Sequence, residues 1–331
     1  MRKPLVVTFL NDDKIDPDVC LLAKLCYANG VDYAICLFAD VDFDDGVLDA
    51  FVWTPDGLVR EKVGFPTYAE CMSCDEQMRD AISHHSKVLD DYALSKKEIS
   101  DLLLTSEFAE NIIPTLHTHN PHRILEFAKM FPEIIVKPIR GARGEGIVCI
   151  KPQVDSFAFS LVDSSEFVLD GDGGVKKLSE LFGGLTVIVQ PRMNFRSKSG
   201  AMMDFRINVA KNGNGQWQKV FAIARTNPTG IVSNLSTGGY ATDGGAALLC
   251  EFGDDAVSIS EKLIRISTEV PVIVEKASKC HMLTMGIDVA IDRDSLTPYI
   301  IEVNYVPQVH FHKDAYNGAK ADYFRYLSKQ E

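Results

Sequence analysis

The sequence predicts an α/β fold that becomes α+β in its larger C-terminal part. Three observations lead to this class. Strand-like runs alternate with helix-length patterns over residues 1–85, short strand-like runs dominate from about residue 134, and two hairpin patterns follow residue 200. With 331 residues, 46% of them hydrophobic, the chain is long enough to bury more than one core.

Composition and charge exclude several functional classes. The net charge of −12 argues against nucleic acid as the main partner, because nucleic acids repel an acidic surface. No apolar run approaches the roughly 18 residues that cross a bilayer, so we expect no membrane-spanning segment. The opening "PLVVTFL" is short and runs into acidic residues, which favours a buried strand over a signal peptide. Eight cysteines scattered through mostly apolar stretches predict reduced thiols in a cytoplasmic protein.

Residues 1–85 form the first predicted unit. "PLVVTFL" is predicted as a strand, "DPDVCLLAKLCYANG" as a helix and "VDYAICLF" as a strand, which together indicate a parallel α/β unit. It contains no glycine-rich dinucleotide fingerprint, so nucleotide binding is not predicted here. Cys71 and Cys74 precede His84 and His85 and hint at zinc, but a second ligand pair at a suitable spacing is missing.

The next stretch, residues 86–116, is predicted to be helical and carries Lys96 and Lys97 in its middle. Strands are then predicted at "IIVKPI", "GIVCIKP", "FAFSLV", "EFVLDG" and "TVIVQP", with the amphipathic helix "VKKLSELF" before the last of them.

A glycine-rich link joins the first two of these strands and contains Gly141, Gly144 and Gly146, with Lys137 at the end of the preceding strand. Glycines allow main-chain N–H groups to approach an anion closely, and the lysine adds a point charge beside them. The link is not a Walker loop, because no helix and no G-K-[ST] follow. The alternative is a flexible turn with solvated charges.

The stretch "DFRINVAKNGNGQWQKVFAIART" predicts two strands around a Gly/Asn turn. Asp204 and Arg206 share one strand face, and Arg225 ends the second strand. Converging arginines suit phosphate or carboxylate binding, whereas the alternative is an Asp204–Arg206 bridge on the strand surface. The following glycine- and serine-rich stretch, "TGIVSNLSTGGYATDGG", carries Asn234. The alternative interpretation of this stretch is a surface loop without a functional role.

A closing hairpin is predicted from strands at about 286–292 and 298–304 around "RDSLT". A symmetric register pairs Asp288 with Glu302 and Gly286 with Asn304, and alternation puts the three polar side chains on one face. The other face, with Ile287, Val289, Ile291, Ile301 and Val303, is predicted to pack in the core. Facing carboxylates repel unless a cation lies between them, which favours Mg²⁺ or Mn²⁺ over the alternative of surface charges.

These motifs resemble those of ATP-grasp enzymes. "VKPIRGARGEGI", "VIVQP" and "GIDVAID…IIEVN" occur in that family's order, and "VIVQPRM", "SNLSTGG" and "EVNYVP" are similar to its YheC/YheD-like branch. The resemblance covers roughly residues 85–310. It implies an ATP-grasp fold with an N-terminal Rossmann-like pre-ATP-grasp domain at residues 1–85, an N-lobe with its lid at 86–189, and a C-lobe with the metal and phosphate site at 190–331.

The resemblance also implies a role for individual residues. ATP would contact the lid lysine and its glycines, the hinge glutamine and one of two earlier lysines, between which the sequence does not decide: Lys137, Gly141, Gly144, Gly146, Gln190, and Lys96 or Lys97. Mg²⁺ (or Mn²⁺) would be held by Asp288, Glu302 and Asn304. The transferring phosphoryl group would be stabilised by Arg206 and Arg225, with Asn234 in the matching loop.

One departure from the family pattern concerns position 286. ATP-grasp ligases of the peptidoglycan type often carry an arginine two residues before the first metal aspartate, where this chain has Gly286. Arg225 is our candidate for the missing donor.

The implied reaction is ATP-dependent ligation of a carboxylate to an amine through an acyl phosphate, with release of ADP and phosphate. The expected partners are a small-molecule or peptide carboxylate and an amine acceptor such as an amino acid; nucleic acid and membrane are not expected, and a homodimer is left open. Two alternatives remain at this stage: a nucleotide-binding or structural protein of the same fold without ligase activity, and a phosphotransferase acting on a non-carboxylate acceptor.

Overall fold

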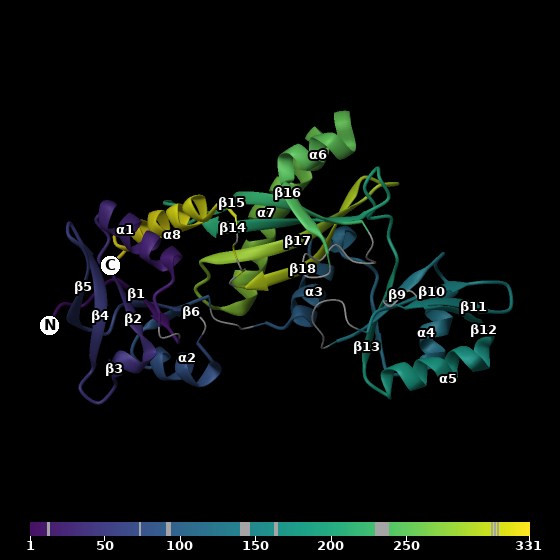
Figure 1. Ribbon diagram of the computed structural model, residues 1–331, viewed down its shortest axis with the longest axis horizontal. Coiled ribbons are helices and arrows are strands. Elements are labelled where there is room, and N and C mark those ends of the chain that lie inside the picture. The colour runs from purple at the N-terminus through teal and green to yellow at the C-terminus, as the bar shows by residue number, and fades with distance from the viewer. Residues whose placement is uncertain are drawn as a thin grey trace.

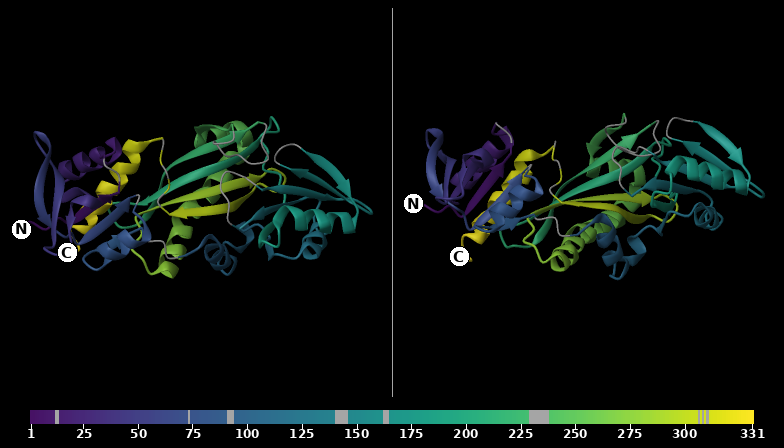
Figure 2. Two further views of the ribbon diagram at one scale, coloured as in Figure 1. Left: turned by 60° about the horizontal axis from the view of Figure 1, so that its bottom comes forward. Right: turned by 90° about the horizontal axis from the view of Figure 1, so that it is seen from below.

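The computed structural model describes residues 1–11, 14–72, 74–90, 94–139, 146–161, 165–228, 238–305, 307, 309 and 311–331. Within these residues the chain forms three β-sheets, each covered by helices. The first sheet lies at one end of an elongated molecule, the second at the other end and the third between them (Figures 1 and 2). The mixed α/β class predicted from the sequence is confirmed. No helix in the described residues is long and apolar enough to cross a membrane.

The first sheet has the order β3-β4-β2-β1-β6-β7, with β5 paired to β4. β1 runs parallel to β2 and β6, and β6 runs parallel to β7, as the alternation of strands and helices predicts. β3, β4 and β5 add an antiparallel extension. Its elements are β1 (Val6–Leu10), α1 (Pro17–Ala28), β2 (Tyr33–Leu37), a 3-10 turn (Phe38–Asp40), β3 (Val41–Asp42), β4 (Val47–Thr54), β5 (Gly57–Gly64), β6 (Tyr68–Met72), α2 (Glu76–Ser83) and β7 (Lys87–Leu89).

The second sheet is antiparallel where its strands are paired, with the order β12-β11-β10-β9-β13-β8. Two helices pack on one of its faces, and their apolar side chains share a core with Val136 of β9 and Val187 and Val189 of β13. Its elements are β8 (Leu116–Thr118), α4 (Pro121–Ala128), β9 (Ile134–Pro138), β10 (Val148–Pro152), β11 (Phe157–Leu161), β12 (Glu166–Leu169), α5 (Gly171–Phe182) and β13 (Val187–Pro191).

The third sheet has the order β16-β15-β14-β17-β18 and is antiparallel throughout. Its apolar face packs against the long helix α7 and against α3, and Ile207, Ile287 and Ile266 lie in this core. Its elements are α3 (Lys96–Leu104), a 3-10 turn (Ala109–Asn111), β14 (Met202–Lys211), β15 (Trp217–Asn227), β16 (Tyr240–Asp243), α6 (Gly244–Phe252), a 3-10 turn (Gly253–Asp255), α7 (Ala256–Ser278), β17 (Thr284–Asp292) and β18 (Thr297–Tyr305).

The last helix, α8 (Lys313–Leu327), returns to the first sheet. It packs against α1, and its Tyr323, Phe324 and Leu327 share a core with Val6 and Leu22. The first sheet also continues past residue 85, to Leu89 in β7. The domain boundaries implied by the resemblance stay predictions. The C-terminal helix packs in the same core as the N-terminal residues.

The prediction of one helical stretch over residues 86–116 is wrong. The segment contains strand β7, then Asp90 with a left-handed φ of 53°, then the nine-residue helix α3. The helix begins where it does because Ser95 and Glu98 form a capping box, in which each side chain accepts a bond from the other residue's main chain.

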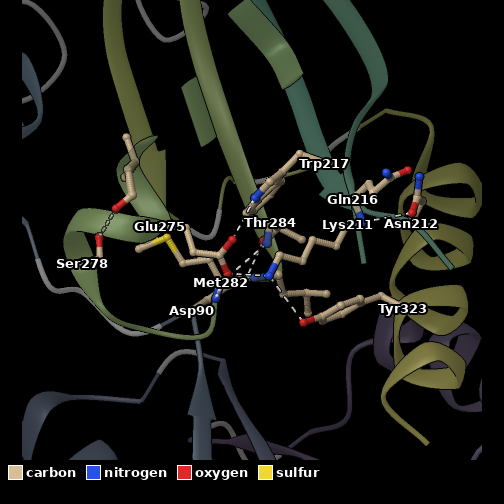
Figure 3. Close-up of polar contacts among 12 residues, drawn as sticks. Asp90, Lys211, Asn212, Gln216, Trp217, Glu275, Ser278, Met282, Thr284 and Tyr323 are labelled. Carbon is tan, nitrogen blue, oxygen red and sulfur yellow. Dashed lines mark hydrogen bonds and ion pairs between the residues drawn. The ribbon is translucent and has the colours of Figure 1, made fainter. Parts of the chain in front are cut away.

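Asp90 joins the first sheet to the third (Figure 3). Its buried carboxylate accepts hydrogen bonds from the N–H groups of Leu283 and Thr284, at 2.5 and 3.1 Å, and from the Thr284 hydroxyl at 2.8 Å. Thr284 is the first residue of β17, so the start of that strand is held from the end of β7. Burial raises the pKa of Asp90 to about 6, although these three donors oppose the shift.

A second group of bonds supports the same junction (Figure 3). Lys211, at the end of β14, forms an ion pair with Glu275 of α7 and contacts the Tyr323 hydroxyl of α8 at 3.5 Å. The indole N–H of Trp217 donates to Glu275 at 3.0 Å. The central sheet, α7 and the returning helix therefore meet around one partly buried ion pair.

The junction predicts a pH-dependent difference between the wild type and Asp90→Asn. A carboxyl whose pKa rises to about 6 on folding stabilises the fold while it is protonated, and that stability is lost as pH rises through 6. The asparagine cannot titrate. We expect the free energy of unfolding of the wild type, relative to the variant, to fall by about 2 kcal/mol from pH 4 to pH 7, measured by urea denaturation. Parallel pH profiles would contradict this assignment.

Candidate functional site

Five charged residues lie close together on one face of the third sheet. Asp288 of β17 is opposite Glu302 of β18, and Gly286 is opposite Asn304, which confirms these two predicted pairs of the closing hairpin. On the other side of β17, Arg206 of β14 is opposite Asp288. Two residues before Arg206 on β14, Asp204 is opposite Arg225 of β15. We call the set Asp204, Arg206, Arg225, Asp288 and Glu302 the ionic grid.

The grid is held by bidentate ion pairs. Arg206 binds both carboxylate oxygens of Asp288, with Nη2 2.7 Å from Oδ2. Arg225 binds both oxygens of Asp204, at 2.6 and 2.7 Å, and its Nη2 also lies 3.1 Å from Oδ2 of Asp288. Asp288 is only 4% exposed, and two guanidinium groups compensate its charge. The alternative of an exposed Asp204–Arg206 bridge is therefore wrong, because Asp204 is buried and paired across the strands with Arg225.

Arg225 is a permanent cation in this setting. Burial alone would lower its pKa, but the hydrogen bonds and charges of Asp204 and Asp288 outweigh burial and raise that pKa above its ordinary value. Arg225 can therefore supply fixed positive charge and directed hydrogen bonds, and it cannot serve as a proton donor.

The core face of the hairpin differs from the prediction at one residue. A bulge after the Asp288–Glu302 pair places Val289 opposite Ile300. Ile300 is 6% exposed and packs in the core, whereas Ile301 is 37% exposed. The assignment of Ile301 to the core is wrong, because the extra residue in the bulged strand interrupts the alternation of faces.

The two neighbouring lysines lie in different surroundings. Lys96, the first residue of α3, forms an ion pair with Glu302 at the edge of the grid. Lys97 instead pairs with Asp101, one turn further along the same helix. The geometry thus brings Lys96, and not Lys97, to the ionic grid.

Lys137 and Gln190 lie on the second sheet, on the face away from α4 and α5. In the register of β9 and β13, Lys137 is opposite Ile188 and Gln190 is opposite Ile135, and antiparallel partners share a face. The Gln190 amide donates to the Thr115 hydroxyl at 2.9 Å. Burial lowers the pKa of Lys137, Glu302 opposes the shift and Lys96 adds to it. The charge of Glu302, a member of the ionic grid, therefore acts on Lys137.

A pair of buried amides continues the polar face beyond the grid. Asn208 of β14 and Asn304 of β18 both lie opposite Gly286. Oδ1 of Asn208 and Nδ2 of Asn304 are buried and have no hydrogen-bond partner among the described residues. Our reading of the sequence missed Asn208, although its position two residues after Arg206 on the same strand face was a usable signal.

Gly286 makes room for the chain itself. A Cβ at this position would lie 2.8 Å from Cβ of Pro307, which covers the strand there. The glycine that replaces the expected arginine is thus required by a close approach of the chain. The nearest cation to Asp288 apart from Arg206 is Arg225, our candidate for the missing donor.

Three predicted residues, Gly141, Gly144 and Asn234, lie outside the described residues. Gly146 is described and has a left-handed φ of 72°, a conformation that suits glycine.

The donor set fits a divalent cation in the type of its ligands, because Asp288, Glu302 and the carboxamide of Asn304 present oxygen atoms on one face, and such atoms suit a hard ion such as Mg²⁺. In this structure the oxygens of Asp288 bind Arg206 and Arg225, and Glu302 pairs with Lys96, so a bound ion would replace some of these contacts. Among the described residues, no group of three or more His, Cys, Asp or Glu side chains is arranged to hold a metal. A bound ion would thus need the amide and the oxygens of a second ligand to complete its shell.

A separate open cavity of about 630 Å³ lies at the start of β7. Lys87, Lys279 and His281 are among its lining residues, and it contains no residue of the ionic grid.

Comparison with known families identifies a match over most of the chain. Residues 85–328 match the model of the YheC/D-like ATP-grasp family, which confirms the resemblance inferred from the motifs. No curated protein sequence matches the chain significantly.

Solved structures with a similar fold include ATP-grasp ligases. The ligase PsnB complexed with a minimal precursor is 13% identical, with a TM-score of 0.53 and 100% of both chains covered. PsnB with the precursor, Mg and ADP is 12% identical, with a TM-score of 0.53 and 99% of this chain and 100% of that chain covered. A RiPP-associated ATP-grasp ligase from Chryseobacterium gregarium, in complex with ADP and a leader and core peptide, is 12% identical, with a TM-score of 0.50 and coverage of 100% and 98%. These likenesses show the ATP-grasp fold.

The ion pairs of the grid predict a stability cost for Arg225→Met. The change leaves Asp204 buried without its bidentate partner and removes one of two cations from Asp288. We expect a loss of about 3 kcal/mol in the free energy of unfolding, measured by urea denaturation. Arg325→Met, at an exposed pair with Asp322, is the matched control and should leave stability almost unchanged. Equal effects of the two changes would argue against a buried ionic grid.

Proposed function

Because the chain belongs to the YheC/D-like ATP-grasp family, we propose that it is an ATP-dependent ligase that joins a carboxylate to an amine. One observation carries this proposal: the ionic grid, Lys96 and Lys137 bring four cations and three carboxylates together, in a protein whose net charge is −12. A local excess of positive charge, with oxygen donors for a divalent ion beside it, suits a polyphosphate.

Each residue has a proposed task in nucleotide binding. Lys96 from α3 and Lys137 from β9 neutralise the phosphates, and the glycines at 141, 144 and 146 cover them. The backbone beside Gln190 binds the adenine. Asp288, Glu302 and Asn304 would hold Mg²⁺ or Mn²⁺, which when bound screens the phosphate charges and favours their attack by a nucleophile.

The proposed reaction has two steps. A carboxylate oxygen of the first substrate attacks the γ-phosphorus of ATP, the bond to ADP breaks, and an acyl phosphate forms. The amine of the second substrate then attacks the acyl carbon, phosphate leaves, and the nitrogen loses a proton to give the amide. Such chemistry requires positioning and charge neutralisation more than a protein nucleophile.

Arg206 and Arg225 are proposed to act on the transferring phosphoryl group. Both are held in place by Asp288 and Asp204, so their N–H groups are oriented before a substrate arrives. Asn234, which follows β15 in the sequence, is proposed to assist in the same step. The permanent charge of Arg225 supports an electrostatic role in this step.

The test is a product assay. Purified protein is incubated with ATP, Mg²⁺ and a panel of amino acids and peptides, since the PsnB structures contain a peptide precursor. We expect ADP and phosphate to appear only with a carboxylate–amine pair, together with an amide detected by mass spectrometry. A phosphorylated product without an amide would identify a phosphotransferase instead. Absence of ADP across the panel would count against a ligase.

Glu302→Gln should abolish turnover and preserve the fold. The substitution keeps the shape of the side chain and removes the charge that faces Asp288 and pairs with Lys96. We expect the rate of ADP release to fall about 100-fold or more, with an unchanged circular dichroism spectrum. Retained activity would refute the metal assignment.

Lys96→Met and Lys97→Met form a matched pair that tests the choice between the lysines. Only Lys96 lies at Glu302, so its loss should weaken ATP binding about tenfold, as measured by calorimetry with a non-hydrolysable analogue. Lys97→Met should bind like the wild type. The reverse pattern would assign the contact to Lys97.

A further inference from the structure

The open cavity of about 630 Å³ at the start of β7 lies between the first sheet and the end of α7. Among the residues that line it are Lys87 of β7, Lys279 and His281 after α7, Lys3 before β1 and Glu331 after α8. Figures 1 and 2 show both ends of the chain beside the first sheet. The volume is that of a site for a small molecule. The proposed ligation makes no use of this cavity.

Positive charge predominates in the lining of the cavity. Three lysines contribute to it, Lys3, Lys87 and Lys279, and Glu331 is the one acidic side chain among the described residues that line it. Neither Lys3 nor Lys279 forms an ion pair with a residue in the described ranges. In a protein whose net charge is −12, such a local excess of positive charge indicates an anionic ligand.

The Glu331 side chain shows which kind of group these donors bind. Its Oε1 accepts hydrogen bonds from the Tyr68 hydroxyl at 3.0 Å and from Nζ of Lys87 at 3.2 Å. These two bonds and the charges of Lys87 and Lys3 lower the pKa of Glu331. The ion pair is open to solvent, because Lys87 is 54% and Glu331 41% exposed, and exposed ion pairs are weak. An external anion can therefore replace the carboxylate of Glu331 at this position.

Main-chain bonds fix the two elements that carry the lysines. The carbonyl oxygen of His281 accepts from the N–H of Asp90 at 2.9 Å, and a β-bridge joins His281 to Leu89 of β7. The segment that carries Lys279 is thereby held beside the strand that carries Lys87. Lys279 also has a left-handed φ of 56°, at a helix end where glycine is common and where a lysine costs free energy.

We propose that the cavity binds a small-molecule anion that carries two or more phosphate or carboxylate groups. One group takes the place of the Glu331 carboxylate and accepts hydrogen bonds from Lys87 and Tyr68. A second group binds Lys3 or Lys279, which have no ion-pair partner among the described residues. An anion with a single group would only exchange one carboxylate for another at Lys87, so the charge of the other two lysines favours a ligand with a second group.

A lysine-acylation footprint of the wild-type chain tests the proposal residue by residue. The protein is treated briefly with an amine-acylating reagent in metal-free buffer of constant ionic strength, alone or with pyrophosphate or citrate as the probe. Tandem mass spectrometry then measures acylation at each lysine. At saturation, we expect at least one probe to slow acylation about tenfold at Lys3, Lys87 and Lys279. Lys24 and Lys276, which are exposed and do not line the cavity, should react at an unchanged rate.

The two probes separate the sources of the anion. Protection by pyrophosphate alone identifies a ligand with phosphate groups, and protection by citrate alone identifies a polycarboxylate. Lys96 and Lys137 report on the ionic grid in the same experiment, so the cavity and the proposed ligase site are read independently. Unchanged acylation at Lys3, Lys87 and Lys279 with both probes at about 10 mM would overturn the proposal.

Two double variants of exposed lysines test whether the cavity itself holds the probe. Lys3→Met combined with Lys279→Met should raise the probe concentration that half-protects Lys87 about tenfold, because two cations of the lining are removed. Lys24→Met combined with Lys276→Met makes the same change in net charge outside the cavity and should leave that concentration unchanged. Equal values in the two double variants would assign the protection to overall charge and overturn the proposal.

Glu331→Gln tests the competition inside the cavity. The substitution keeps the size of the side chain and removes the carboxylate that pairs with Lys87. We expect the probe concentration that half-protects Lys87 to fall about threefold in this variant. An equal or higher concentration would show that Glu331 does not compete with the ligand, which contradicts the proposed mode of binding.

Discussion

The pairing of Asp288 with Arg206 and Arg225 is the constraint on which the third sheet depends. A carboxylate only 4% exposed is tolerated because two guanidinium groups bond to it, and each arginine comes from a different strand. The three side chains therefore set the relative register of β14, β15 and β17. A slip of one residue would turn Asp288 toward Ile207 and Ile266 in the core.

The same strand also carries the connection to the first sheet. β17 begins at Thr284, which Asp90 holds, and reaches Asp288 four residues later. After the third sheet the chain continues to α8, which packs in the core of the first sheet. The two sheets are thus joined by a buried carboxylate and by a shared hydrophobic core, so the grid is built on a strand anchored at its start.

Periodicity in the sequence was sufficient for the pairs Asp288–Glu302 and Gly286–Asn304, because Ile287 and Val289 flank Asp288 and Val303 separates Glu302 from Asn304. It was insufficient at Ile301, where a bulge changes which residue faces the core. It was also insufficient for β7, whose continuation at Leu89 is bridged to His281, almost two hundred residues away. The choice between Lys96 and Lys97 depends on where α3 begins, because that position decides which lysine faces Glu302. The S-x-x-E pattern at Ser95 indicates this start, but the sequence analysis did not use it.

The electrostatics of the ionic grid favour an anionic ligand. Lys96 of α3 pairs with the carboxylate of Glu302, and the charge of the same carboxylate acts on Lys137 of β9, whose pKa is lowered by burial and by Lys96. Two lysines that share one acid repel each other, and this repulsion is relieved only when further negative charge lies between them. A polyphosphate supplies that charge. Binding of such a ligand would therefore oppose the lowering of the Lys137 pKa.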